Sequence, residues 1–99
     1  MHLSDKQLAT LITWAKTNPD IQAVFLRSRA QGTAAPDSNV ELALSITGHD
    51  PLRRLATFIS HRRVWRAELE AALGLAVQLE RARGDPSAET GYVELWQRA

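Results

Sequence analysis

The chain has 99 residues, 44% of them hydrophobic and 23% charged, values typical of one folded globular domain spanning residues 1–99. Twelve basic residues against eleven acidic ones give a net charge of +1, which argues against general nucleic-acid binding. Because there is no cysteine, disulfides, thiolate metal sites and cysteine nucleophiles are excluded. The sequence has no apolar run approaching the ~18 residues of a membrane span. It also lacks a signal-peptide pattern, so we expect a cytoplasmic protein.

The first third of the chain predicts one helix and two strands. Ser4 followed by Gln7 is typical of a capping box, and the helix that begins there should end before Pro19. The apolar run 21–26 predicts a buried strand. Residues 31–38 contain Gly, Pro, Asp and Ser and predict a loop. The alternation from 39 to 46 predicts a half-buried strand, with apolar residues at even positions and Asn39, Glu41, Ala43 and Ser45 on the other face.

A long helical region follows. Asp50 and Pro51 are typical of a helix start, and Gly74 of a left-handed helix stop after residue 73. Leu55, Ile59, Leu69 and Leu73 share one face, but Arg62 and Arg66 fall within the same stripe. A single helix and two shorter helices broken near residues 60–61 therefore both remain open.

The last third predicts two more strands. Residues 75–80 alternate with period two, and residues 92–97 alternate weakly, with a short helix as the competing interpretation. We therefore expect an α+β fold: a small mixed sheet of about four strands with helices packed on one face.

The segment 24–46 carries the most chemical information. Main-chain N–H groups at the turn near Ser28 and Arg29 can form an anion site, to which Arg27 adds positive charge. Oxygens of Asn39 and Glu41 on the next strand are suited to a hard cation such as magnesium. The plainer alternative is that these are ordinary polar residues of a turn and of a solvent-exposed strand face.

This segment resembles the minimal nucleotidyltransferases, small relatives of the DNA polymerase beta superfamily. Their hallmark is a strand ending in Gly-Ser, an Arg-x-x-Gly turn, and a Pro-Asp-Ser loop that leads to Asp-x-Asp. The matching residues are Leu26, Ser28, Arg29, Gly32, Pro36, Asp37 and Ser38. The later helix and strands echo the family order, so the resemblance extends over most of the chain. It implies a nucleotidyltransferase-like fold with a phosphate site at Ser28, Arg29 and Arg27.

The chain departs from the family at its functional positions. Arg27 stands where the family has glycine, Asn39 and Glu41 replace the paired aspartates, and Gln78 is the nearest equivalent of the third acid. In the family these carboxylates hold two magnesium ions that bind a nucleoside triphosphate and activate the attacking hydroxyl. The replacements reduce the local charge from −3 to −1. We therefore expect catalysis to be lost and no cofactor to be needed.

Three hypotheses about the function follow from this pattern. The first is an inactive nucleotidyltransferase-like module that binds a small helical partner protein or forms a homo-oligomer and holds a nucleotide weakly at most. The second is an active enzyme using magnesium and a nucleoside triphosphate, with Glu41 and Glu80 as an altered acid set, because Glu80 shares a strand face with Gln78. The third is an unrelated α+β interaction domain. Trp65 and Trp96 are candidate partner anchors if they prove exposed.

Overall fold

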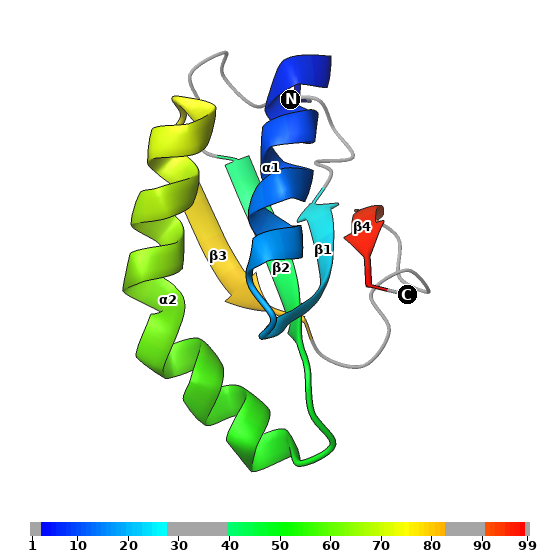
Figure 1. Ribbon diagram of the computed structural model, residues 1–99, viewed down its shortest axis with the longest axis vertical. Helices are drawn as coiled ribbons and strands as arrows, with labels where there is room; N and C mark the ends of the chain where they lie inside the picture. Colours follow the sequence, from blue (N-terminus) through cyan, green and yellow to red (C-terminus); the bar gives the residue numbers. More distant parts are fainter. Residues whose placement is uncertain (1–2, 28–39, 83–90, 99) are drawn as a thin grey trace.

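A computed structural model gives the structure of the chain and describes residues 3–27, 40–82 and 91–98. These residues form a four-stranded sheet with two helices on one face (Figure 1). The elements are α1 Asp5–Thr17, β1 Ile21–Arg27, β2 Val40–Ile46, α2 Pro51–Leu73, β3 Val77–Arg81 and β4 Tyr92–Gln97. The predicted α+β class, the helices on one face and the strand at 92–97 are confirmed. The predictions for Ser28, Arg29 and Asn39 lie outside the described residues.

The sheet is mixed and has the strand order β3-β2-β1-β4. β1 runs antiparallel to both β2 and β4, whereas β2 and β3 are parallel. Two adjacent parallel strands need a crossover connection, and here α2 supplies it. With 23 residues, α2 is about 35 Å long at 1.5 Å per residue. The β2–α2–β3 unit therefore places the first turn of α2 beside the carboxyl end of β2.

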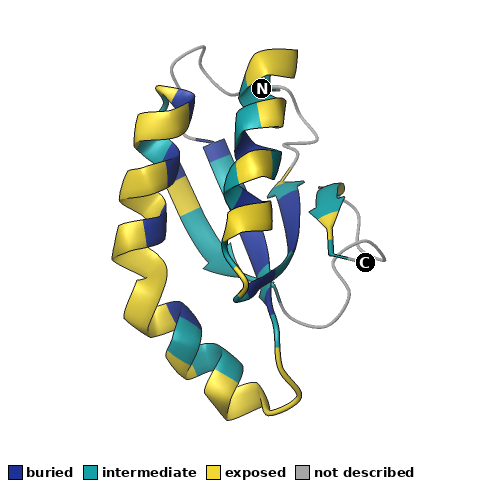
Figure 2. Ribbon diagram, in the orientation of Figure 1, coloured by how far each residue is buried: buried dark blue, intermediate teal, exposed yellow. Residues whose placement is uncertain are grey.

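α2 is one continuous helix, which settles the choice between one helix and two. Its buried residues are Phe58, Trp65, Leu69 and Leu73, at spacings of seven and four. Ile59, which the sequence analysis placed in the core stripe, is 63% exposed, so that assignment is wrong. Arg62 lies between Phe58 and Trp65 on the side of the buried stripe, yet both Arg62 and Arg66 are exposed, and the helix continues through them without a break. Exposed and buried residues alternate along α2 in Figure 2.

Both predicted ends of α2 are present. The Asp50 carboxylate accepts a hydrogen bond from the Leu52 N–H at 3.0 Å, and Pro51 occupies the first turn. Gly74 has φ +69°, a left-handed conformation, and its N–H donates to the Glu70 carbonyl at 2.9 Å. No atom outside its immediate neighbours lies within 4 Å of a Cβ added at Gly74. The cost of a side chain at this position is therefore conformational.

We expect Gly74→Ala to lower the free energy of unfolding by about 1 kcal/mol, because alanine pays for the left-handed conformation that glycine adopts freely. Urea denaturation measures this change. Gly74→Asn is the matched control and should cost less, since asparagine tolerates this conformation better than other residues. Equal losses in both variants would show that steric contact, and not φ, limits the position.

The main core lies between the helices and the sheet. It contains the side chains that the four strands direct toward the helices, together with the buried faces of α1 and α2. The fully buried members include Leu11, Leu42, Leu44 and Leu69. The capping box predicted at the start of α1 is present, with Ser4 and Gln7 bonded reciprocally. Gln7 also donates to the Leu73 carbonyl at 3.0 Å, which ties the start of α1 to the end of α2.

The opposite face of the sheet, called the open face below, carries a second and smaller cluster. Ala23, Phe25 and Ala43 are buried there, with Tyr92 and Ala82 packed against them. The period of two predicts Ala43 on the solvent side of a half-buried strand, but Ala43 is only 1% exposed. The prediction of the strand face on which Ala43 lies is confirmed, but the predicted exposure of Ala43 is wrong, because residues distant in sequence cover its side chain.

Within the residues that the structure describes, no helix combines the length and apolar character needed to cross a membrane.

Candidate functional site

The structure brings four of the predicted site residues to one small pocket on the open face. Arg27 from the end of β1, Glu41 from β2, and Gln78 and Glu80 from β3 line it together with Leu79. The pocket has a volume of about 100 Å³. Glu41 and Gln78 are paired in the parallel β2–β3 register, so they lie on neighbouring strands at the same level. Their common face follows from the period of two in each strand.

An ion pair occupies the first carboxylate of this pocket. Arg27 Nε lies 3.8 Å from Glu41 Oε2. The Glu41 side chain is 18% exposed, whereas that of Arg27 is 53% exposed. The guanidinium thus reaches from the exposed end of β1 toward a carboxylate that is largely shielded from water. The chain itself therefore contributes a cation to this pocket.

A hydrogen bond occupies the second carboxylate. The Tyr92 hydroxyl donates to Glu80 Oε1 at 2.9 Å. Tyr92 lies on β4 and Glu80 on β3, at the two edges of the sheet, with β1 and β2 between them. The tyrosine side chain therefore lies across the open face and packs on the Ala43 cluster. Glu80, the residue offered as a replacement acid, is already engaged by a side chain from the far edge strand.

We expect Tyr92→Phe to destabilise the protein by about 1 kcal/mol, because it removes one hydrogen bond to a charged, part-buried acceptor and keeps the ring. Tyr92→Leu should cost more, since the ring also covers the open-face cluster. Thermal or urea unfolding of both variants separates these two contributions. A Tyr92→Phe protein as stable as the wild type would mean that the bond to Glu80 contributes nothing in solution.

These residues do not suit a pair of magnesium ions. The pocket holds two carboxylates and one guanidinium, a net charge of −1. Two cations held 3.5–4 Å apart repel strongly and need compensating carboxylates around them. The described part of the chain contains no group of three or more His, Asp or Glu side chains placed to hold a metal ion. Gln78 supplies a neutral amide and is exposed.

The remaining predicted site residues lie outside the described part of the chain. They are Ser28 and Arg29 of the proposed phosphate turn and Asn39 before β2. Sequence reasoning missed one member of the site, Tyr92, which it treated only as the first residue of a strand. No local pattern indicates that it reaches β3, because the contact joins the two edges of the sheet and depends on the strand order.

The two tryptophans predicted as partner anchors differ in how far they are buried. Trp65 is 3% exposed and belongs to the core, so it is not available to a partner. Trp96 is partly buried and lies under the Arg98 guanidinium, 5.0 Å from the ring centroid. The large apolar side chains that are exposed on α2 are Leu52, Ile59 and Val64. Arg66 and Glu70, four residues apart on α2, form an ion pair at 3.8 Å.

No protein-family model matches the sequence, and no curated protein matches it. Among solved structures, the chain is similar to the crystal structure of the toxin–antitoxin MntA–HpeT in a mutant with two aspartates changed to glutamate. The TM-score is 0.58 at 23% sequence identity, with 92% of this chain and 73% of the other covered. At this identity the likeness concerns the fold. The chain has a nucleotidyltransferase-like α+β fold, similar to that of a chain from a toxin–antitoxin pair.

Proposed function

We propose that the protein is a nucleotidyltransferase-like module without nucleotidyl transfer activity and that it acts by binding a small helical partner protein. The observation that carries the first part is the internal engagement of both pocket carboxylates, Glu41 by Arg27 and Glu80 by Tyr92. A metal ion entering the pocket would have to displace a cation from one and a hydroxyl donor from the other. Gln78, at the position of the third acid, adds no charge to offset that cost.

Electrostatics and geometry support the same conclusion. The Arg27 guanidinium makes the electrostatic potential in the pocket less negative, whereas divalent cations need a strongly negative potential there. Glu41 is one methylene longer than the aspartate it replaces, and magnesium demands near-ideal octahedral geometry. Misplacement of a reacting group by about 1 Å can cost a factor of about 100 in rate. Charge and position therefore both work against transfer.

The partner part of the proposal is supported by α2. Leu52 and Ile59, seven residues apart and so on one face of the helix, are 76% and 63% exposed, and Val64, on another face, is 56% exposed. They are interspersed with the exposed arginines Arg53, Arg62 and Arg63. The similar structure is of a toxin–antitoxin pair, which supports a protein partner as the function. A second copy of the chain is the competing occupant of the same face.

An assay of nucleotidyl transfer tests the first part. The protein, alone and with its copurifying partner, is incubated with magnesium and each radiolabelled nucleoside triphosphate in turn. We expect no label on either protein or on added RNA. Magnesium-dependent labelling that Glu41→Gln abolishes would overturn the proposal.

Labelling of that kind would instead establish the second candidate function, an active enzyme with an altered acid set. One observation favours it: Glu41 and Glu80 do line the same pocket. In that case Glu80→Gln should also abolish labelling, because the two residues would form the metal site together. Arg27→Gln should then raise the activity.

The partner is tested with the product of the neighbouring reading frame, which we expect to be a small all-helical protein that copurifies with this chain. Ile59→Glu should break the complex, because it places a charge on the exposed apolar face that Ile59 shares with Leu52. Val93→Glu is the matched control, since Val93 is also half-exposed but lies on β4. If only the Val93 variant loses the complex, the partner binds at the β4 edge of the sheet and not on α2. Sedimentation of the chain alone reveals self-association.

A further inference from the structure

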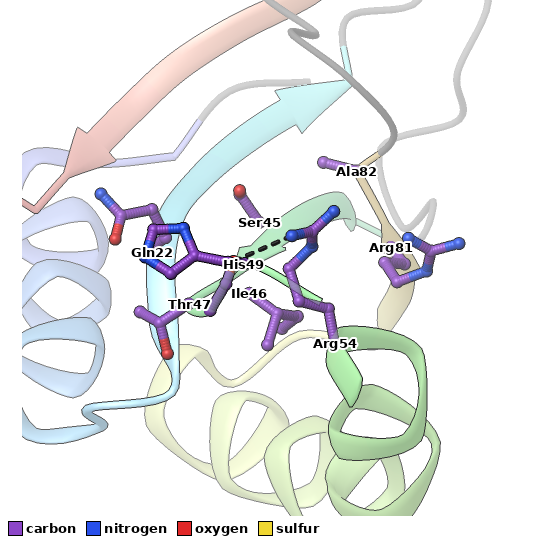
Figure 3. A pocket seen from close by; sticks show the side chains of 9 residues that line it. Gln22, Ser45, Ile46, Thr47, His49, Arg54, Arg81 and Ala82 are labelled. Carbon is purple, nitrogen blue, oxygen red and sulfur yellow. Dashed lines mark hydrogen bonds between the residues drawn. The ribbon is translucent and has the colours of Figure 1, made fainter. Parts of the chain in front are cut away.

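We propose that a second site, at the carboxyl end of β2, binds a small molecule through its phosphate group. A cavity of about 360 Å³ lies there, bounded by β1, β2, β3 and the first turns of α2 (Figure 3). On β2 the lining residue nearest to Glu41 is Ser45, four residues and about 13 Å along the strand, and the two pockets share no lining residue. The cavity is therefore distinct from the candidate nucleotidyltransferase pocket.

Two arginines line this cavity, and no carboxylate of the described residues does. Arg54 enters it from α2, Arg81 from β3, and His49 from the turn between β2 and α2 (Figure 3). Among the described residues, no carboxylate lies within ion-pair distance of Arg54 or Arg81. Asp50, next to His49, is turned to the start of α2, where it caps the Leu52 N–H, and it does not line the cavity. An anion would relieve the repulsion between these cations.

One of the two arginines is already held in place. Arg54 Nη1 donates to the Gly48 carbonyl at 2.8 Å, which fixes the guanidinium beside the turn. A guanidinium carries five N–H donors in a rigid plane, so most of them remain for a ligand. Planar, bidentate donation to phosphate or carboxylate oxygens is the interaction for which arginine is best suited. Because Arg54 is oriented before binding, less side-chain freedom is lost on binding.

Uncharged polar groups complete the lining. Ser45 and Gln22 face the cavity from β2 and β1. The Thr47 hydroxyl donates to the Pro19 carbonyl at 3.3 Å. The Thr47 hydroxyl oxygen can still accept a hydrogen bond from a hydroxyl group of a ligand in the cavity. The volume falls within the range of small-molecule sites. Arginines, hydroxyls and an amide favour a phosphorylated polar molecule over an apolar one.

The test is calorimetric titration with pyrophosphate, AMP and ATP as separate probes, without magnesium and at low salt. We expect saturable binding of pyrophosphate. Arg81→Gln and Arg54→Gln should each weaken it by about tenfold, the loss expected for a charge-assisted hydrogen bond. Arg53→Gln is the matched control: it removes the same charge from the neighbouring position of α2, outside the cavity, and should leave the affinity nearly unchanged.

Each outcome bears on the proposal. Tighter binding of AMP or ATP than of pyrophosphate identifies a nucleotide as the ligand, and the reverse identifies a free polyphosphate. Loss of binding in Arg53→Gln equal to that in Arg81→Gln would overturn the site, since it indicates attraction by net charge alone. Absence of saturable binding for all three probes would also overturn it. Within the described residues the Arg81 side chain makes no hydrogen bond or ion pair, so its replacement should leave the fold intact, and a thermal melt of that variant verifies this.

This site and the proposed function fail independently. Pyrophosphate binding at Arg54 and Arg81 should be unchanged in Glu41→Gln, which alters only the other pocket. Binding that Arg27→Gln abolishes but Arg81→Gln leaves intact would place the anion at the Glu41 pocket and refute the second site.

Discussion

Replacing Trp65 with alanine should lower the free energy of unfolding by about 3–5 kcal/mol, the range for truncating a large buried aromatic side chain. Trp65 is 3% exposed and lies at the centre of an aromatic group. Its ring meets Trp14 of α1 edge-on at 6.4 Å, packs against Phe58 at 6.5 Å and stacks on His61 at 5.1 Å. The loss would be a large fraction of the total stability of a domain of this size.

Urea denaturation of Trp65→Ala and Val64→Ala side by side measures the effect. Val64 is the preceding residue on α2 and is 56% exposed, so its truncation should change the stability by no more than about 0.5 kcal/mol. Similar small losses in both variants would contradict the packing of α1 on α2 through Trp65. That packing holds the two helices on one face of the sheet and leaves the open face to the pocket.

Restoring negative charge to the Glu41 pocket should create a magnesium site. The double variant Arg27→Ala with Gln78→Asp removes the guanidinium and adds a third carboxylate beside Glu41 and Glu80. The net charge of the lining then changes from −1 to −3. We expect magnesium affinity to rise by about 100-fold or more, equivalent to about 3 kcal/mol, because each change acts at contact distance in a partly shielded pocket.

Magnesium titration by calorimetry is the measurement. The control, Arg53→Ala with Gln97→Asp, makes the same change in net charge on exposed positions away from the pocket. It should leave magnesium binding as in the wild type. Equal affinities in the double variant and in this control would show that the four pocket residues do not converge as described, and that the resemblance to the nucleotidyltransferases does not extend to the metal site.

Local signals in the sequence were enough to locate the elements. The capping box at Ser4 and Gln7, the Asp50 cap and the Gly74 stop depend on neighbours two to four residues away, and all are present. The period of two in β2 also placed Glu41 on the face opposite the core. These features are local because hydrogen bonding within one turn or one strand decides them.

Tertiary packing decided what the sequence left open. Two stripes on α2 satisfy helical spacing, and the choice between Ile59 and Phe58 as the buried residue depends on how the helix is rotated against the sheet. Ala43 is buried because Tyr92, 49 positions later, lies over the same face. The engagement of Glu80 by Tyr92 has the same origin, since it requires the strand order that brings β4 to the far edge.

The cavity lined by Arg54 and Arg81 could not be predicted from the sequence either, because it depends on tertiary structure. In sequence these arginines lie 27 positions apart and neither belongs to a motif. The β2–α2–β3 crossover brings them together, because it returns the chain to the sheet with β3 parallel to β2 and sets the start of the helix beside the ends of both strands.

The direct measurement of the central claim is calorimetric titration of the wild-type protein with ATP in the presence and absence of magnesium. We expect no magnesium-dependent binding, because Arg27 and Tyr92 already engage the carboxylates that a metal would need. Any metal-independent binding should depend on Arg81 rather than Glu41. Micromolar affinity that requires magnesium and disappears in Glu41→Gln would contradict the account.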